Sequence, residues 1–146
     1  MTVLAHKKRL VFFIISLLII VLTGFLLKNQ YAEDRVVMSG YSFVAKIMDN
    51  DALRQKGLSG RTNMQSNEAM LFKFEEVSER CFWMKEMNFD IDIIWLDGGY
   101  KVTAIEQNIS PDTYPKEYCH NGQYVVEIKA GLANELDLKN GDKIKY

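Results

Sequence analysis

Four side chains, Arg61, Trp83, Lys85 and Asp92, are the main candidates for chemistry in this sequence. Lys85 lies in the run CFWMKEM and Asp92 lies in the run FDIDIIWLD, so both charges have aromatic and aliphatic neighbours. An isolated buried charge is costly, and charged groups in such surroundings are therefore expected to be paired or functional. A binding site, if the chain has one, is expected around these two runs.

Two interpretations of the four residues remain open. In a strand, Trp83 and Lys85 would point to the same face, with Asp92 in the same region of the sheet. Arg61 ends the glycine-containing loop GLSGR, which could approach that face. An indole that stacks on a ring and charges that orient it would suit a small polar ligand, such as a sugar or a carboxylated metabolite. In the alternative, Arg61 or Lys85 pairs with Asp92 and Trp83 belongs to the core.

Other kinds of site have weaker support in the sequence. Asp90 and Asp92 would share a strand face, and nearby carboxylates can raise each other's pKa, but this spacing alone does not build an acid–base pair. His120 beside Cys119 offers too few ligands for a zinc site. No nucleotide-binding or nucleophile motif is present. We therefore predict no catalytic residue, no metal site and no cofactor.

The two cysteines, Cys81 and Cys119, are expected to form a disulfide. Both follow the apolar N-terminal segment, on the side of the chain that we place outside the cytoplasm, where disulfides persist. The alternative is two free thiols. Because the pair is far apart in sequence and contains no CxxC motif, redox catalysis is not indicated.

The N-terminal segment predicts a membrane anchor. Leu10 to Leu27 is almost wholly apolar and, as a helix, would rise about 27 Å, close to the ~30 Å hydrocarbon core. The basic residues just before it, Lys7 to Arg9, place residues 1–9 in the cytoplasm and the rest outside. A cleaved signal peptide is the rival, but the apolar run is longer than its usual core and no good cleavage site follows. The chain is thus expected at the cell membrane through residues 10–27.

Charge divides the chain at about residue 31. Four of the 18 basic residues precede it, whereas all 19 acidic residues follow it, so the remainder carries a net charge of −5. An acidic domain argues against nucleic acid as a partner, because nucleic acid rewards a basic surface.

The pattern after the anchor predicts a mainly β domain. We expect a tether over residues 28–39 and an outer domain over residues 40–146. Strands are expected at 40–48, 69–74, 81–87, 91–96, 100–109, 124–129 and 143–146, and short helices at about 51–56 and 132–138. The intervening segments 75–80 and 110–123 are expected to be a turn and a long irregular stretch. Many short strands with few helical residues favour a small β-barrel or sandwich-like domain, preceded by a single transmembrane helix.

Several segments together resemble one known family. They are GLSGR (57–61), AMLFKF (69–74), FWMKEMNFDIDIIWLD (82–97), YVVEIKAG (124–131) and NGD (140–142). In this order and spacing they are similar to the prokaryotic family catalogued as domain of unknown function 192, over about residues 41–146. The chain departs from the family pattern at Ser59, Ala69 and Asp90, where Met, Gly and Pro are usual. The resemblance implies a small β-rich fold, with an export or anchor segment in many members, and it carries over no catalytic residue.

Three functions remain as hypotheses. The first is a non-enzymatic module that binds a small ligand or glycan, or is associated with the cell envelope. The second is an enzyme acting on an envelope component, and the third is a structural partner of another membrane protein.

Overall fold

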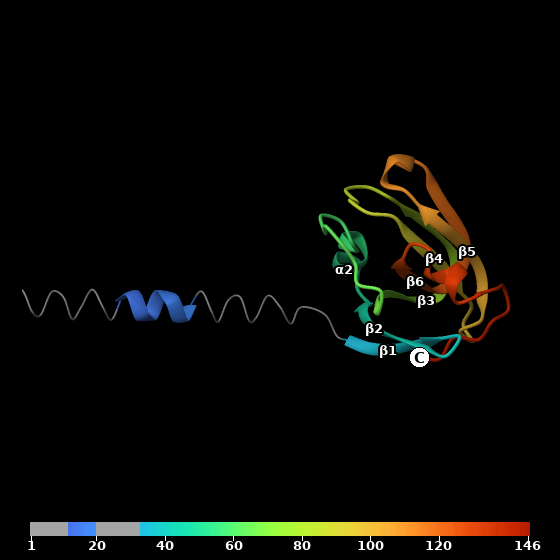
Figure 1. Ribbon diagram of the computed structural model, residues 1–146, viewed down its shortest axis with the longest axis horizontal. Helices are drawn as coiled ribbons and strands as arrows, with labels where there is room; N and C mark the ends of the chain where they lie inside the picture. The colour runs from blue at the N-terminus through green and yellow to red at the C-terminus, as the bar shows by residue number, and fades with distance from the viewer. Residues whose placement is uncertain (1–11, 20–32) are drawn as a thin grey trace, which may run out of the picture. The chain divides into compact units, whose positions relative to one another are not determined.

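The computed structural model describes residues 12–19 and 33–146, in two compact units, Met1–Ala32 and Glu33–Tyr146. Residues 12–19 form a helix (Figure 1). The rest of the predicted anchor, like residues 1–9 and 28–32, lies outside the described residues. Within the described part of the chain, no helix is both long and apolar enough to cross a membrane.

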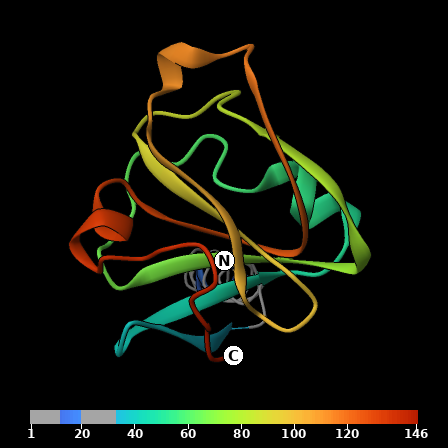
Figure 2. The same ribbon diagram turned by 90° about the vertical axis from the view of Figure 1, so that its right-hand side faces the viewer.

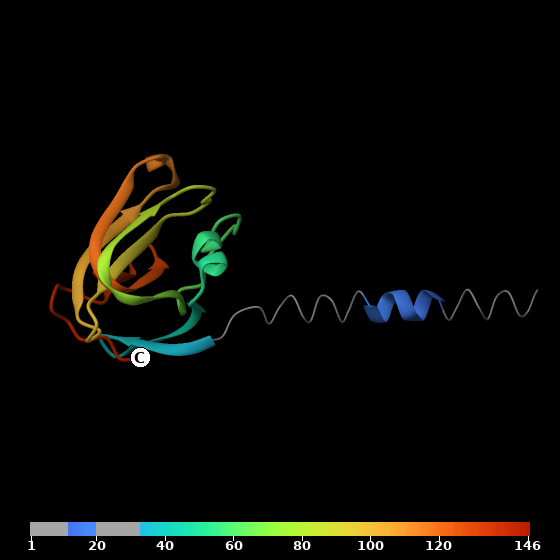
Figure 3. The ribbon, with the colours of Figure 1, turned by 180° about the vertical axis from the view of Figure 1, so that it is seen from behind.

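One six-stranded sheet organises the second unit, in the order β1-β2-β3-β6-β4-β5 (Figures 1 and 3). Its strands are β1 (Glu33–Met38), β2 (Tyr41–Met48), β3 (Glu68–Trp83), β4 (Ile91–Leu96), β5 (Val102–Ile109) and β6 (Glu117–Lys129). Two short α-helices, α2 (Asp51–Lys56) and α3 (Leu132–Glu135), and the 3₁₀-helix η1 (Pro111–Thr113) accompany them. All neighbouring strands are antiparallel except β2 and β3, which are parallel.

Helix α2 begins the parallel crossover, and its ends follow from the sequence. The Asn50 side chain accepts a hydrogen bond from the Leu53 amide at 3.1 Å, which satisfies one of the free N–H groups of the first turn. Gly57 then ends the helix at φ 43°, a left-handed conformation that glycine adopts readily. This helix was predicted within its observed bounds.

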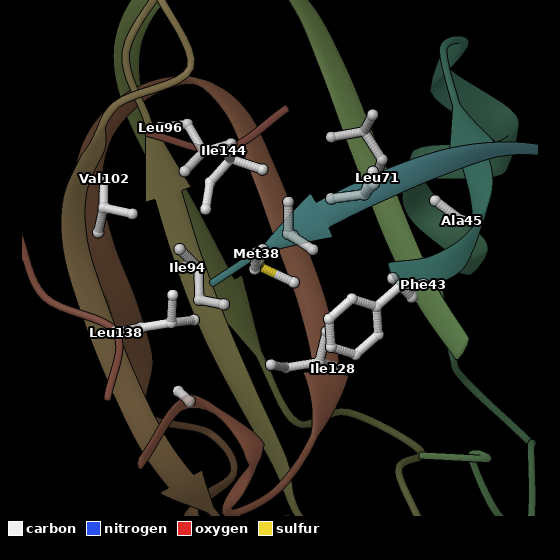
Figure 4. Close-up of a cluster of buried hydrophobic side chains, with 14 of the residues drawn as sticks. Met38, Phe43, Ala45, Leu71, Ile94, Leu96, Val102, Ile128, Leu138 and Ile144 are labelled. Atoms are coloured by element: carbon white, nitrogen blue, oxygen red, sulfur yellow. The ribbon is translucent and has the colours of Figure 1, made fainter. Parts of the chain in front are cut away.

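One face of the sheet covers the main core (Figure 4). Alternate residues of β2, among them Phe43, Ala45 and Ile47, point into it as the period-2 pattern predicts. The C-terminal segment contributes Leu138 and Ile144. Burial of this apolar surface is the main source of the domain's stability.

The opposite face of the central strands is also buried. Phe72 of β3 lies across from Val125 of β6, which lies across from Trp95 of β4. Each of these side chains is at most 1 % exposed. Strands buried on both faces read as continuous apolar runs, which is why IDIIWL shows no alternation.

The two longest strands, β3 and β6, form a curved ribbon (Figure 2). A register shift between Lys73 and Ser78 separates its inner part from its outer part. In the outer part, Cys81 and Cys119 are directly opposite and form a disulfide, with their Cα atoms 4.1 Å apart. The predicted pairing of the cysteines is therefore present.

The sheet is open, so the prediction of a closed barrel is wrong. Its edge strands β1 and β5 do not pair with each other. Instead, the C-terminal segment makes isolated bridges from Lys145 to Val37 of β1 and from Lys143 to Lys101, the residue just before β5. The mainly β character with few short helices is confirmed.

Four segments differ from the expectation. The strand β3 runs without a break through residues 75–80, where a turn was expected. Strand β6 begins at Glu117, inside the stretch 110–123 that was expected to be irregular. Strand β1 occupies half of the expected tether, and residues 143–146 make bridges rather than a full strand.

Candidate ligand pocket

A pocket of about 420 Å³ opens on the outer side of the central strands. One wall is formed by α2 and the segment that follows it. The other is formed by β3, the segment after β3, and Glu127 of β6. Its lining residues are Asp51, Arg54, Gln55, Lys56, Gly57, Leu58, Ser59, Phe72, Phe74, Glu79, Arg80, Cys81, Phe82, Trp83, Lys85, Met87 and Glu127. The volume falls in the range of pockets that hold small ligands, about 300–1,000 Å³.

Glu127 is the unusual member of this lining. Its cross-strand neighbours are Met70 and Ile93, and it is only 6 % exposed. Its Oε2 atom has no hydrogen-bond partner among the described residues. Burial raises the pKa of the Glu127 carboxyl to about 8, so this group is mainly neutral at pH 7.

Aromatic rings form much of the pocket wall. Phe72 and Phe82 meet edge to face with their centroids 4.9 Å apart. Phe74 lies beneath two guanidinium groups, with the Cζ atoms of Arg54 and Arg80 at 5.2 and 4.0 Å from its centroid. These two contacts show that the rings of this wall accept cations on their faces.

Three basic residues, Lys56, Arg80 and Lys85, form what we call the basic rim of the pocket. Lys56 and Lys85 are exposed, and neither makes an ion pair within the described part of the chain. Arg80 donates from Nη2 to the Glu76 carbonyl at 3.0 Å, whereas its buried Nε has no partner among the described residues. The lining acid Asp51 is paired with Arg54 at 2.6 Å, which leaves Glu79 as the exposed acid beside the rim.

Two of the four predicted site residues, Trp83 and Lys85, line this pocket. Trp83 is 52 % exposed, so it is not the core residue of the structural interpretation. Its indole is available to a ligand at the edge of the pocket.

Asp92 lies elsewhere and is completely buried. Its Oδ1 accepts hydrogen bonds from the amides of Asn108 at 2.8 Å and Gly131 at 3.1 Å, and its Oδ2 accepts one from Ala133 at 2.9 Å. The carboxylate therefore fixes the start of α3 and the end of β5. The interpretation that Asp92 pairs with Arg61 or Lys85 is wrong, because backbone donors already satisfy it.

Arg61 instead forms a two-pronged ion pair with Glu68, with N–O distances of 2.9 and 2.8 Å. Lys46 reaches the same carboxylate at 3.0 Å. Burial raises the pKa of Glu68, but the hydrogen bonds from Arg61, Lys46 and the Gln65 amide outweigh it and lower the pKa to about 2. Arg61 thus connects the GLSGR loop to the start of β3 and does not line the pocket.

The remaining candidates do not form a reactive site. Asp90 is exposed while Asp92 is buried, so the two carboxylates do not share a site. Cys81, Glu117 and Cys119 lie within 4.8 Å of one another, but both sulfurs are used by the disulfide. His120 contacts the Glu106 carboxylate through Nε2 at 2.8 Å and packs against Trp95.

Sequence reasoning missed Glu127, although a signal was present. It is the single acid inside the strand YVVEIK, among apolar neighbours, and the argument applied to Lys85 and Asp92 applies equally to it.

The chain matches known proteins over most of its second unit. The family model described as DUF192, Uncharacterized ACR, matches residues 35–146. A solved structure from Sinorhizobium meliloti, titled as a "putative transcription regulator", has a TM-score of 0.73 and 24 % identity, over 79 % of this chain and 94 % of its own. A protein of unknown function from Novosphingobium aromaticivorans has a TM-score of 0.71 and 28 % identity, over 81 % and 88 %. No curated protein matches the chain.

Proposed function

The chain belongs to the DUF192 family of uncharacterised proteins, and from that premise we propose that residues 33–146 form a small-ligand-binding module. The observation that carries the proposal is the buried Oε2 of Glu127, which lines a pocket of about 420 Å³ and has no hydrogen-bond partner in the described part of the chain. A buried polar group left without a hydrogen bond costs about 1–3 kcal/mol. A ligand that supplies the missing partner would recover this cost.

The shape and chemistry of the lining support the same function. Aromatic side chains provide apolar contact area, while a few polar groups converge on the space and can orient a bound molecule, as is usual for small-ligand sites. Trp83 at the pocket edge can stack on a flat or ring-shaped ligand. Sugars and carboxylated metabolites are the ligand classes that this combination favours.

We expect a bulky side chain on α2 to abolish binding. Gln55 lines the pocket and is exposed, so Gln55→Trp would fill the entrance without disturbing the core. Ala52 is exposed on the same helix but does not line the pocket, which makes Ala52→Trp the matched control. The measurement is the ligand-induced shift in melting temperature, with a panel of envelope glycan fragments, amino acids and small carboxylic acids.

The expected result is a shift for at least one panel member with the wild type and with Ala52→Trp, but none with Gln55→Trp. Equal shifts in all three proteins, or none with any compound, would contradict the pocket as a binding site.

An enzyme acting on an envelope component is the second candidate, and Glu127 is the observation that favours it. A carboxyl held neutral near pH 7 has the property of a general acid. Chemical conversion of a panel member that disappears in Glu127→Gln would establish this function, whereas binding without conversion supports the module.

We further propose that the module is held at the outer side of the cell membrane by residues 10–27. The apolar run after Lys7 to Arg9 and the disulfide of the domain support this location. Alkaline phosphatase, which is active only after export, tests it when fused after Tyr146. Activity is expected with the full chain and not after deletion of residues 10–27, and an inactive full-length fusion would refute the location.

A further inference from the structure

The two buried side-chain atoms that lack a partner in the described part of the chain both belong to pocket-lining residues. One is Oε2 of Glu127 and the other is Nε of Arg80. One is a carboxyl oxygen and the other is a donor that is always charged. A molecule that satisfied both would need opposite kinds of group, a donor for Glu127 and an acceptor for Arg80.

The Glu127 end of the pocket favours a cationic donor. A neutral carboxyl can bond to a hydroxyl or an amide, but hydrogen bonds in which the donor or the acceptor is charged are about twice as strong as those between neutral groups. Burial raises the pKa of this carboxyl, and an ammonium group brought to Glu127 would supply a countercharge that favours its ionised form. The ring of Phe74 is already occupied by Arg54 and Arg80, but Phe72 and Phe82 also line the pocket and offer further aromatic surface to a cation.

The basic rim favours the opposite charge. Among the described lining residues, Lys56, Arg80 and Lys85 of the rim are accompanied by one exposed acid that makes no ion pair, Glu79, so the mouth of the pocket carries an excess of positive charge. Such a mouth repels a ligand that is only cationic and attracts an anionic group. Arg80 and Lys85 can then hold a carboxylate by charge-assisted hydrogen bonds.

We propose that the ligand is a small zwitterion, with an ammonium group against the Glu127 carboxyl and a carboxylate against the basic rim. This inference rests on the proposed ligand-binding function and names its ligand class, that of amino acids and short peptides. The pocket volume of about 420 Å³ accommodates molecules of this size. On binding, Glu127 loses its proton to solvent and pairs with the ammonium group.

The test uses probes of matched length and different charge. They are 6-aminohexanoate and leucine as zwitterions, hexylamine as the cation, hexanoate as the anion and hexanamide as the neutral compound. Binding to the full chain in detergent is followed at pH 7 by NMR, with the carboxyl carbon of Glu127 as the reporter of its ionisation. We expect at least one zwitterion to bind about tenfold more tightly than any other probe and to shift this carbon to its ionised position.

Two substitutions test which charged group of the ligand binds at the Glu127 end of the pocket and which binds at the basic rim. Glu127→Gln keeps the shape of the side chain and should weaken zwitterion binding about tenfold or more, in line with about 1.5–3 kcal/mol for a hydrogen bond to a charged group. Lys85→Gln should weaken the zwitterion and hexanoate but should not weaken hexylamine, because the rim repels a cation. Lys101→Gln, an exposed lysine outside the pocket, is the control and should change nothing.

The outcomes separate this inference from the function on which it rests. If hexanoate, hexanamide or a sugar binds in the pocket as tightly as the zwitterions and Glu127 stays neutral, the module stands and the zwitterion is refuted. An unchanged affinity in Glu127→Gln also refutes it. If no probe and no member of the ligand panel shifts the pocket resonances, both proposals fail.

Discussion

Replacement of Asp92 by alanine is expected to lower the free energy of unfolding by about 3–5 kcal/mol, the largest effect of any single substitution considered for this domain. The side chain is completely buried and accepts three backbone hydrogen bonds, from Asn108, Gly131 and Ala133. Alanine would leave these three amides without their partner, and each unsatisfied buried donor costs about 1–3 kcal/mol.

The measurement is urea unfolding of the full chain, followed by tryptophan fluorescence. Asp92→Asn should cost less than alanine, because one oxygen remains to accept while the new NH₂ group faces an amide donor. Asp90→Ala is the matched control, since Asp90 is an exposed carboxylate two residues away on the same segment, and it should change stability by less than about 0.5 kcal/mol. Similar losses at positions 90 and 92 would contradict the role assigned to Asp92.

The backbone hydrogen bonds of Asp92 illustrate which features of the site are visible in the sequence and which are not. That this charge must be satisfied follows from its apolar neighbours alone. Its partners do not, because backbone amides are present at every residue and leave no mark in the sequence. The search for a partner therefore turned to the visible cations, Arg61 and Lys85, of which one pairs with Glu68 and the other stays exposed at the pocket.

The fold was predictable where local signals were strong. The expected strand at 40–48 and helix at about 51–56 agree with β2 and α2 to within one residue, because alternation in the strand and cap residues at the helix ends are local signals. The run EEVSER looked like a turn because it is polar, yet it continues β3, since the outer ribbon is exposed and is held by pairing with β6. Strand β1 was missed although Val36 and Met38 alternate inward, because three charged residues begin it.

The pocket itself depends on long-range pairing. Its lining combines α2 and its following segment, both parts of β3, and Glu127 of β6, which are brought together only by the order of strands in the sheet. No local pattern contains that order. The apolar neighbours of Glu127 mark it as a candidate in the sequence, but its place in the same pocket as Trp83 and Lys85 follows only from the pairing of β6 with β3.

Stability is expected to fall as the pH rises from 5 to 8, by about 3–4 kcal/mol, through Glu127 alone. Burial raises the pKa of this carboxyl from 4.5 to about 8, so the folded chain binds its proton more tightly than the unfolded chain. Its contribution is complete below pH 4.5 and is lost as the pH rises through 8, with a slope of about 1.4 kcal/mol per pH unit between these limits. Glu68 acts in the opposite sense, because its lowered pKa gives stability that is lost only as the pH falls toward 2.

The decisive comparison is between the wild type and Glu127→Gln, unfolded in urea at half-unit intervals from pH 5 to pH 8. Glutamine has nearly the same shape and cannot ionise, so the difference between the two curves isolates Glu127 from every other group that titrates in this range. That difference should be small at pH 5 and grow in favour of the variant toward pH 8. Parallel curves would mean that Glu127 ionises in the folded protein as readily as in the unfolded chain. A saturating zwitterion should raise the stability of the wild type at pH 8 toward that of the variant, because it gives the ionised carboxyl its partner.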